Sequence, residues 1–125
     1  MATVPPVFTR VGRPDVRQLT WTLANGDVGT PVDLSNYPDK SVDIGGTFGA
    51  GGSVTLRGNN ATSSPDPASS ATVWAALTDP QANAITKTSK AIEEVLENTR
   101  WYSPEVTAGD GTTAITVSIL ARKTR

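Results

Sequence analysis

The sequence KSVDIGGTFGAGGSVTLRGNN, residues 40–60, contains the pattern that decides the fold. Apolar and polar residues alternate over residues 42–48, and the alternation resumes over residues 53–57. A period of two residues is typical of a strand with one buried face. The glycine-rich run 49–52 between the two halves predicts a turn, so we expect residues 40–60 to form a hairpin. The remaining strands should then lie around this hairpin.

Length and composition indicate one small domain that is rich in turns. The chain has 125 residues, including 11 glycines and 9 prolines, and a hydrophobic share of 37%. One domain is the expectation at this length. The low hydrophobic share favours association with copies of the chain or with a larger partner. The formal net charge of −1 gives no overall basic field, so we expect neither nucleic acid nor a membrane as partner.

The residue types that are missing exclude several kinds of chemistry. The chain has no cysteine and no histidine, which excludes disulfides, zinc sites of the usual Cys/His kind and Ser-His-Asp or Cys-His catalysis. Its 12 acidic residues do not show the spacing of an EF-hand loop. The glycine-rich run is followed by a strand pattern rather than by the Lys-Ser/Thr of a phosphate-binding loop. We therefore expect no enzymatic activity and no metal or cofactor.

Residues 1–14 contain no charged segment followed by a long apolar run, which argues against a signal peptide. No stretch approaches the ~18 consecutive apolar residues of a membrane-spanning helix. The expectation is a protein that is made in a cytoplasm, or assembled into something built there.

Further alternating segments predict an antiparallel β-sandwich. Residues 15–24 and 113–123 alternate over most of their length, and the second segment is the clearest long strand. Residues 100–107 also have the composition of a strand, interrupted by Pro104. With about seven to eight short strands at regular turn spacing, we expect an all-β, jelly-roll-like sandwich that forms a single domain over residues 15–125.

One short helix is expected at residues 89–98. Ser89 is a suitable N-cap, and Ile92, Val95 and Leu96 share one helical face. This helix would close one end of the core. By contrast, residues 59–71 are small, polar or proline and predict a flexible surface loop.

Residues 1–14 predict an extended N-terminal arm. Its prolines exclude a regular helix, and its apolar side chains suit an arm that lies on a neighbouring subunit, although a disordered leader is the alternative. Basic residues cluster at both ends of the chain: Arg10, Arg13 and Arg17 near the start, and Arg122, Lys123 and Arg125 at the end. They form either solvated charge or a basic patch facing an acidic protein surface.

The exposed aromatic side chains are expected to be Trp74 and the neighbouring pair Trp101 and Tyr102. Each lies next to an apolar residue that would point to the other face of its strand, so one of the two apolar faces can lie outside the core. Such side chains suit a protein interface or a ligand-stacking platform. Together with the arm, the candidate interface residues are Val4, Val7, Phe8, Arg10, Val11, Arg13, Trp74, Trp101 and Tyr102.

Three segments occur in a distinctive order: VTLRGNN (54–60), WAALTDPQANAIT (74–86) and residues 92–123, which include a GDGTT turn and a final VSILAR strand. This order resembles that of the head decoration, or cement, proteins of tailed bacteriophages. The sequence departs from the family pattern at Gly58-Asn59-Asn60, where the family has Gly-Ser-Asn, and in the long Ser/Pro insertion that follows.

The resemblance implies a β-rich virion subunit, commonly a homotrimer, made in the host cytoplasm. Such a subunit binds the exterior of the capsid where major capsid proteins meet, and the role assigns no catalytic residues. Two alternatives stay open. One is a glycan-binding β-sandwich module on the virion surface that grips host-surface glycans through exposed aromatics. The other is a head–tail or tail structural subunit.

Overall fold

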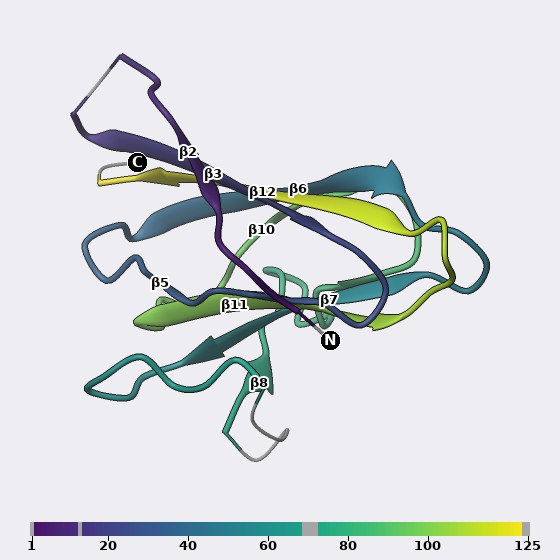
Figure 1. Ribbon diagram of the computed structural model, residues 1–125. Helices are drawn as coiled ribbons and strands as arrows, with labels where there is room; N and C mark the ends of the chain where they lie inside the picture. The colour runs from purple at the N-terminus through teal and green to yellow at the C-terminus, as the bar shows by residue number, and fades with distance from the viewer. Residues whose placement is uncertain (1, 13, 69–72, 124–125) are drawn as a thin grey trace.

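The structure is a computed structural model that describes residues 2–12, 14–68 and 73–123. Its strands form two layers packed face to face (Figure 1). In chain order the strands are β1 (Thr3–Val4), β2 (Val7–Thr9), β3 (Val16–Leu23), β4 (Val28–Gly29), β5 (Val32–Asp33), β6 (Asp39–Thr47), β7 (Ser53–Asn59), β8 (Ala75–Ala76), β9 (Thr86–Lys87), β10 (Ala91–Glu94), β11 (Trp101–Ala108) and β12 (Ala114–Arg122).

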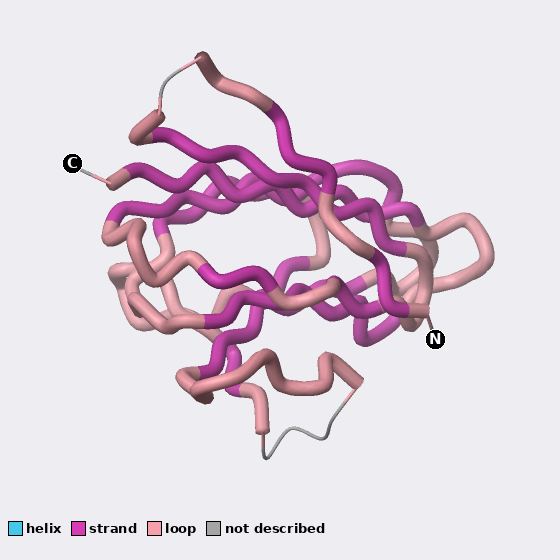
Figure 2. The backbone as a smooth tube through the Cα atoms, turned by 60° about the vertical axis from the view of Figure 1, so that its left-hand side comes forward, coloured by secondary structure: helices cyan, strands magenta, loops and turns pink. Residues whose placement is uncertain are grey.

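We call the two layers sheet A and sheet B. Sheet A has the order β1-β4-β11-β7-β8, with β5 also paired to β11 and β9 to β7. Sheet B has the order β10-β6-β12-β3-β2. Figure 2 shows strands in both layers and loops around them. Apolar side chains from both sheets fill the space between them, chiefly Leu19, Trp21, Leu23, Val42, Ile44, Val54, Leu56, Tyr102, Ile115, Val117 and Ile119.

The two clearest strand patterns are confirmed. Residues 15–24 contain β3, and residues 113–123 contain β12, which lies between β6 and β3 at the centre of sheet B. On both strands every second side chain is buried, as the period of two requires. The all-β class therefore fits, with more and shorter strands than the sequence pattern separates.

The expected hairpin over residues 40–60 is wrong. β6 pairs with β10 and β12 in sheet B, whereas β7 pairs with β11, β8 and β9 in sheet A. Residues 48–52 therefore cross from one sheet to the other (Figure 1, right). The alternating pattern specifies that each strand buries one face. Two strands that face each other across a core satisfy it as well as two that pair side by side.

The expected helix at residues 89–98 is also wrong, and the part of the chain that the structure describes contains no helix. Residues 91–94 form β10, which pairs antiparallel with β6. The apolar spacing does not mark a buried helical face, because Ile92 is 65% exposed and Leu96 is 53% exposed while Val95 is buried. The edge of β6 supplies the backbone hydrogen bonds that a helix would otherwise make within itself.

The N-terminal segment lies along both sheets of its own chain. β1 pairs in parallel with β4 of sheet A, and β2 pairs antiparallel with β3 of sheet B. Pro5 and Pro6 occupy the step between the two strands. The amides of Val28 and Thr30 donate to the carbonyl oxygens of Ala2 and Val4 (3.0 and 2.8 Å). The segment thus closes one side of the sandwich, as Figure 1 shows for the purple chain.

The expected interruption at Pro104 does not occur, because β11 continues through it opposite Leu56. Proline cannot donate a backbone hydrogen bond, and its ring needs space. That space is at Gly29, where a Cβ atom would lie 2.6 Å from the Pro104 Cδ atom and 2.8 Å from the Trp21 Cδ1 atom. The proline and the glycine are therefore matched across the sheet.

Two connections between the sheets lie next to each other at one end of the sandwich. Residues 48–52 join β6 to β7, and residues 109–113 join β11 to β12. The Asp110 carboxylate accepts a hydrogen bond from the Ala50 amide (2.8 Å) and another from the Thr112 amide (2.8 Å). The Thr113 hydroxyl donates to the Phe48 carbonyl oxygen (2.8 Å). Asp110 and Thr113 thus bind one crossing to the other.

These contacts dictate the chemistry of the crossing loops. A Cβ atom at Gly49, whose φ is 73°, would clash with the Asp110 carboxylate. The hydrogen bonds from the Thr112 hydroxyl and from the Ala50 and Thr112 amides hold the pKa of Asp110 at about 2, below its ordinary 3.8. The pKa of Asp110 is lower in the folded chain than in the unfolded chain, so the ionised carboxylate stabilises the fold fully at pH values above its ordinary pKa of 3.8. This stabilisation is lost as pH falls through about 2.

We expect Asp110→Asn to lower the unfolding temperature at about pH 7, because the Asn amide accepts only at its one oxygen. Either the hydrogen bond from Ala50 or those from Thr112 are then lost, together with the charge. The difference from the wild type should shrink as pH falls from about 4 to about 2, since the wild type then loses the same charge. Thermal unfolding followed by circular dichroism over this range measures both effects. A difference that stays constant down to about pH 2 would contradict the assignment.

Candidate interaction surface

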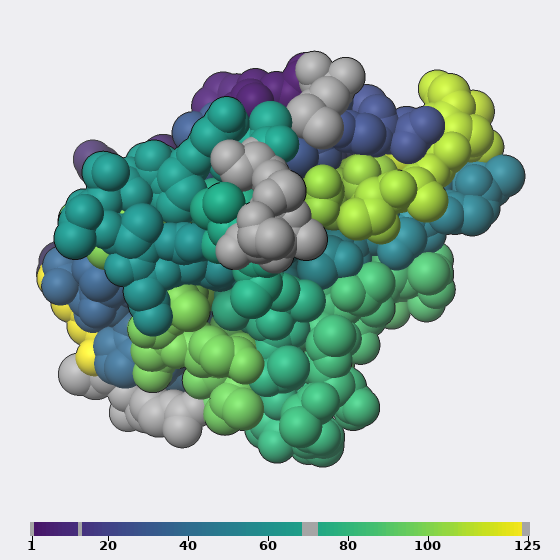
Figure 3. Space-filling model, turned by 90° about the horizontal axis from the view of Figure 1, so that it is seen from below, coloured from purple at the N-terminus to yellow at the C-terminus, as the bar shows by residue number. Residues whose placement is uncertain are grey.

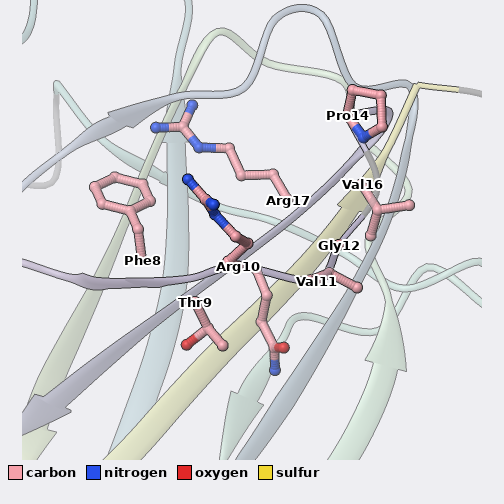
Figure 4. A pocket seen from close by; sticks show the side chains of 9 residues that line it. Phe8, Thr9, Arg10, Val11, Gly12, Pro14, Val16 and Arg17 are labelled. Atoms are coloured by element: carbon pink, nitrogen blue, oxygen red, sulfur yellow. The ribbon is translucent and has the colours of Figure 1, made fainter.

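A hollow of about 660 Å³ opens beside β2 at the edge of sheet B (Figure 4). Its lining comes from residues 8–12, 14 and 16–18, which are β2, the start of β3 and the connection between them. We call this region the β2 surface. It lies near the start of β3, where Val16 pairs with Arg122 at the end of β12. The crossings held by Asp110 adjoin the start of β12, so the β2 surface and these crossings lie at opposite ends of sheet B.

The β2 surface forms because its apolar side chains extend beyond the core. Phe8 lies opposite Leu19 in the register, so it points to the same side of sheet B as a fully buried core residue. Phe8 is nevertheless 52% exposed, because β2 is the edge strand. Val11 lines the same hollow and is also exposed, whereas the exposed Val7 points to the other face of sheet B. Exposed apolar residues that gather in this way are typical of interaction sites.

The β2 surface also carries positive charge. The Arg17 guanidinium carbon lies 4.4 Å from the centre of the Phe8 ring, a cation–π distance. Figure 4 shows the guanidinium groups of Arg10 and Arg17 near the Phe8 ring. Among the described ion pairs, those of arginine belong to Arg57, Arg100 and Arg122, and none involves Arg10 or Arg17. The β2 surface therefore offers two cations to an acidic partner.

The structure brings together three of the candidate residues from the arm: Phe8, Arg10 and Val11. Val7 is exposed, but it lies opposite Thr20 and points to the outer face of sheet B, outside this hollow. Val4 is partly buried against the core. Arg13 lies outside the described residues. Arg17 belongs to the β2 surface although the candidate set omits it; its place in the basic cluster of the sequence was the signal for it.

The expectation that Trp74 and Tyr102 are exposed is wrong. Trp74 is 3% exposed and Tyr102 is fully buried. The Tyr102 hydroxyl donates to the Glu97 carbonyl oxygen (3.1 Å), and burial raises the pKa of Tyr102 to about 12. Trp101 is half-buried and its indole donates to the Ala61 carbonyl oxygen (3.0 Å). None of these rings forms the open platform that the sequence suggested.

Trp74 is buried because the segment after β7 folds back over the outer face of sheet A. The Arg57 guanidinium carbon lies 4.9 Å from the centre of the Trp74 ring, and its Nη2 donates to the Pro67 carbonyl oxygen (3.1 Å). The Trp74 indole donates to the Asp66 carbonyl oxygen (2.9 Å). In Figure 3 the teal segment that follows β7 covers part of this face. Residues 60–68 are thus anchored, contrary to the expected flexible loop.

Arg57 is the organising side chain of sheet A's outer face, and no sequence signal singled it out. It is 5% exposed, and it donates to the Ser103 carbonyl oxygen and the Ser103 hydroxyl (3.2 and 2.8 Å). An arginine at an outward position of a strand ordinarily reaches solvent. Only the fold of residues 60–68 and 73–74 reveals that this one is covered.

Two acidic side chains, Asp79 and Glu97, have pKa values that local hydrogen bonds lower. The pKa of Asp79 is lowered, chiefly by the backbone hydrogen bond from Asn83. Burial acts to raise the pKa of Glu97, but hydrogen bonds from Thr78 outweigh it and lower that pKa. A general acid requires the opposite shift. In the described residues, no three acidic side chains are grouped to hold a metal ion.

No described helix is long and apolar enough to cross a membrane.

The comparisons with known proteins concern the fold. The sequence matches no family model, and no curated protein matches it. The SPBc2 prophage-derived protein YomS has a similar solved structure, with a TM-score of 0.59 and 11% identity over 90% of this chain and 98% of that chain. A cupin domain from Bordetella pertussis Tohama I gives a TM-score of 0.48 and 13% identity over 97% and 95% of the two chains. This chain therefore shares its overall fold with YomS.

A pair of aromatic substitutions tests the burial described above. Trp74→Ala should lower the free energy of unfolding by about 3 kcal/mol, since it leaves a cavity and removes the ring from Arg57. Phe8→Ala, the matched control on the exposed β2 surface, should change it by less than about 0.5 kcal/mol. Urea unfolding at neutral pH measures both. Equal effects, or a larger effect for Phe8→Ala, would contradict the placement of the two rings.

Proposed function

We propose that this protein is a capsid decoration subunit of a tailed bacteriophage. It binds the outer surface of the phage head and stabilises contacts between major capsid proteins. The observation that carries the proposal is the β2 surface, in which exposed apolar side chains gather on one edge of the sandwich with two arginines that take part in none of the described ion pairs.

Two further observations support this function. The order of segments in the sequence resembles that of head decoration proteins, and the GDGTT turn of that pattern is the turn in which Asp110 holds the two crossings together. YomS, which shares the fold, is a prophage-derived protein. A sandwich whose two crossings are hydrogen-bonded to each other at one end suits a subunit that stabilises a capsid.

The β2 surface binds an acidic region of the major capsid protein. Phe8 and Val11 supply apolar area to the centre of the contact, and Arg10 and Arg17 pair with carboxylates around it. Charged groups of this kind guide association and make binding weaken with salt. Three copies that bind together as a homotrimer would multiply these contacts across neighbouring capsid subunits.

A glycan-binding module that uses exposed aromatics has less support, because Trp74 and Tyr102 are buried. A head–tail or tail subunit would need a ring-forming interface. The β2 surface instead lies on one edge of one sheet, which fits docking on a shell better.

Binding to heads that lack the protein tests the proposal. Purified protein should sediment with expanded heads built from the phage's own major capsid protein, in a saturable manner, and less so at high salt. Arg10→Glu combined with Arg17→Glu should weaken binding at least about tenfold, equivalent to about 1.4 kcal/mol.

The control is Lys90→Glu combined with Arg122→Glu, which changes the net charge equally at exposed side chains outside the β2 surface. It should bind as the wild type does. Wild-type protein that stays in the supernatant would refute the decoration function. If the variant that combines Arg10→Glu with Arg17→Glu binds as the wild type does, the assignment of the β2 surface is refuted.

A further inference from the structure

The two outer faces of the sandwich differ in what covers them. The outer face of sheet A carries residues 60–68 and Trp74, which are tied down through Arg57. On the outer face of sheet B, the side chains of the central strands β3, β12 and β6 are half-buried or exposed. This second face contains a hollow of its own.

The hollow has a volume of about 220 Å³ and is lined by six side chains from four adjacent strands: Gln18, Ser41, Asp43, Ile92, Ser118 and Leu120. The strand register accounts for its shape. Ile92, Asp43 and Ser118 form one row across β10, β6 and β12, and Ser41, Leu120 and Gln18 form the next row across β6, β12 and β3. The two serines are small and lie between larger neighbours, which leaves a depression.

The lining combines hydrogen-bonding groups with aliphatic ones. Gln18, Ser41, Ser118 and Asp43 offer an amide, two hydroxyls and a carboxylate, so both donors and acceptors are present. Leu120 and Ile92 offer aliphatic surface, and Ile92 is 65% exposed. A ligand that fits this lining carries hydroxyl groups on its edges and C–H groups on its faces.

Charge narrows the class of ligand further. Asp43 forms an ion pair with Lys90, so the hollow has no uncompensated positive charge to attract an anion. The carboxylate itself disfavours phosphate, sulfate or carboxylate groups. The volume is below the ~300–1,000 Å³ of pockets for drug-sized ligands, which suits a single small ring.

The polar groups of the hollow are already held in place. The Ser118 hydroxyl oxygen accepts hydrogen bonds from the Thr20 hydroxyl (3.1 Å) and from the Gln18 amide (3.3 Å). β12 is paired on both sides over its whole length. Groups fixed on central strands lose little freedom when a ligand binds, which favours binding.

From this juxtaposition we infer that the hollow on the outer face of sheet B is a binding site for a neutral sugar ring. The ring lies with its C–H face against Leu120 and Ile92. Its hydroxyl groups bond to Asp43, Ser118, Ser41 and Gln18. The site is distinct from the aromatic platform that the sequence suggested, and it does not depend on the decoration function.

Titration of ¹⁵N-labelled protein with glucose, galactose, mannose and N-acetylglucosamine tests the inference. At least one sugar should change the NMR chemical shifts of the backbone amides of Ser41, Asp43 and Ser118 in a saturable manner. Saturation is expected at millimolar concentration, because a single ring on an open surface binds weakly. Inorganic phosphate should not shift them. Saturable shifts elsewhere, shifts with phosphate at these amides, or none with any of the four sugars would overturn the inference.

A matched pair of variants on β12 localises the binding. Ser118→Leu fills the hollow and should weaken sugar binding at least about tenfold. Thr116→Leu is the control, since Thr116 lies two residues away on the same face and outside the hollow. It should bind as the wild type does. We avoid Gln18 in this test because it also borders the β2 surface. Ser118→Leu that binds sugar normally would also overturn the site.

Discussion

The structure depends on how two crossings of the chain between its sheets are joined at one end. Residues 48–52 cross from sheet B to sheet A, and residues 109–113 cross back. The Asp110 carboxylate and the Thr113 hydroxyl connect the two crossings through backbone groups of Ala50 and Phe48. Because β6 and β12 are neighbours in one sheet and β7 and β11 in the other, this link joins the ends of four long strands across the sandwich. The β2 surface lies at the opposite end of sheet B.

The sequence predicts well which side chains of a strand are buried, and it predicts poorly which strands pair with each other. Alternation correctly assigned β3 and β12, and it identified the buried side chains of β6 and β7. It placed β6 and β7 in one hairpin because a period of two says which side of a strand is buried and nothing about the strand beside it. The helix at residues 89–98 failed for a related reason. Three apolar residues at helical spacing predict one buried face, whereas only Val95 of the three is buried.

The exposed apolar side chains of the N-terminal segment were easier to predict than the placement of the aromatic rings. An apolar, proline-rich N-terminus with arginines nearby is visible in the sequence, and the structure gathers Phe8, Arg10 and Val11 around one hollow. The burial of Trp74 was not predictable, since it rests on Arg57 and on residues 60–68, which have the composition of a loop with nothing to bury. A polar segment can cover a tryptophan when its backbone carbonyl oxygens accept hydrogen bonds from the indole and from a neighbouring side chain. Here the Asp66 and Pro67 carbonyl oxygens accept from Trp74 and Arg57.

The central claim is that this sandwich docks on a phage head through its β2 surface, with the Asp110 end directed away from that contact. The most direct measurement is an electron cryo-microscopy reconstruction of heads saturated with the protein. The account predicts density for the sandwich on the capsid exterior, with β2 and the Phe8 and Arg17 side chains against the shell. Density that contacts the shell through the outer face of sheet A or through the crossings at Asp110 would contradict it, as would heads without added density.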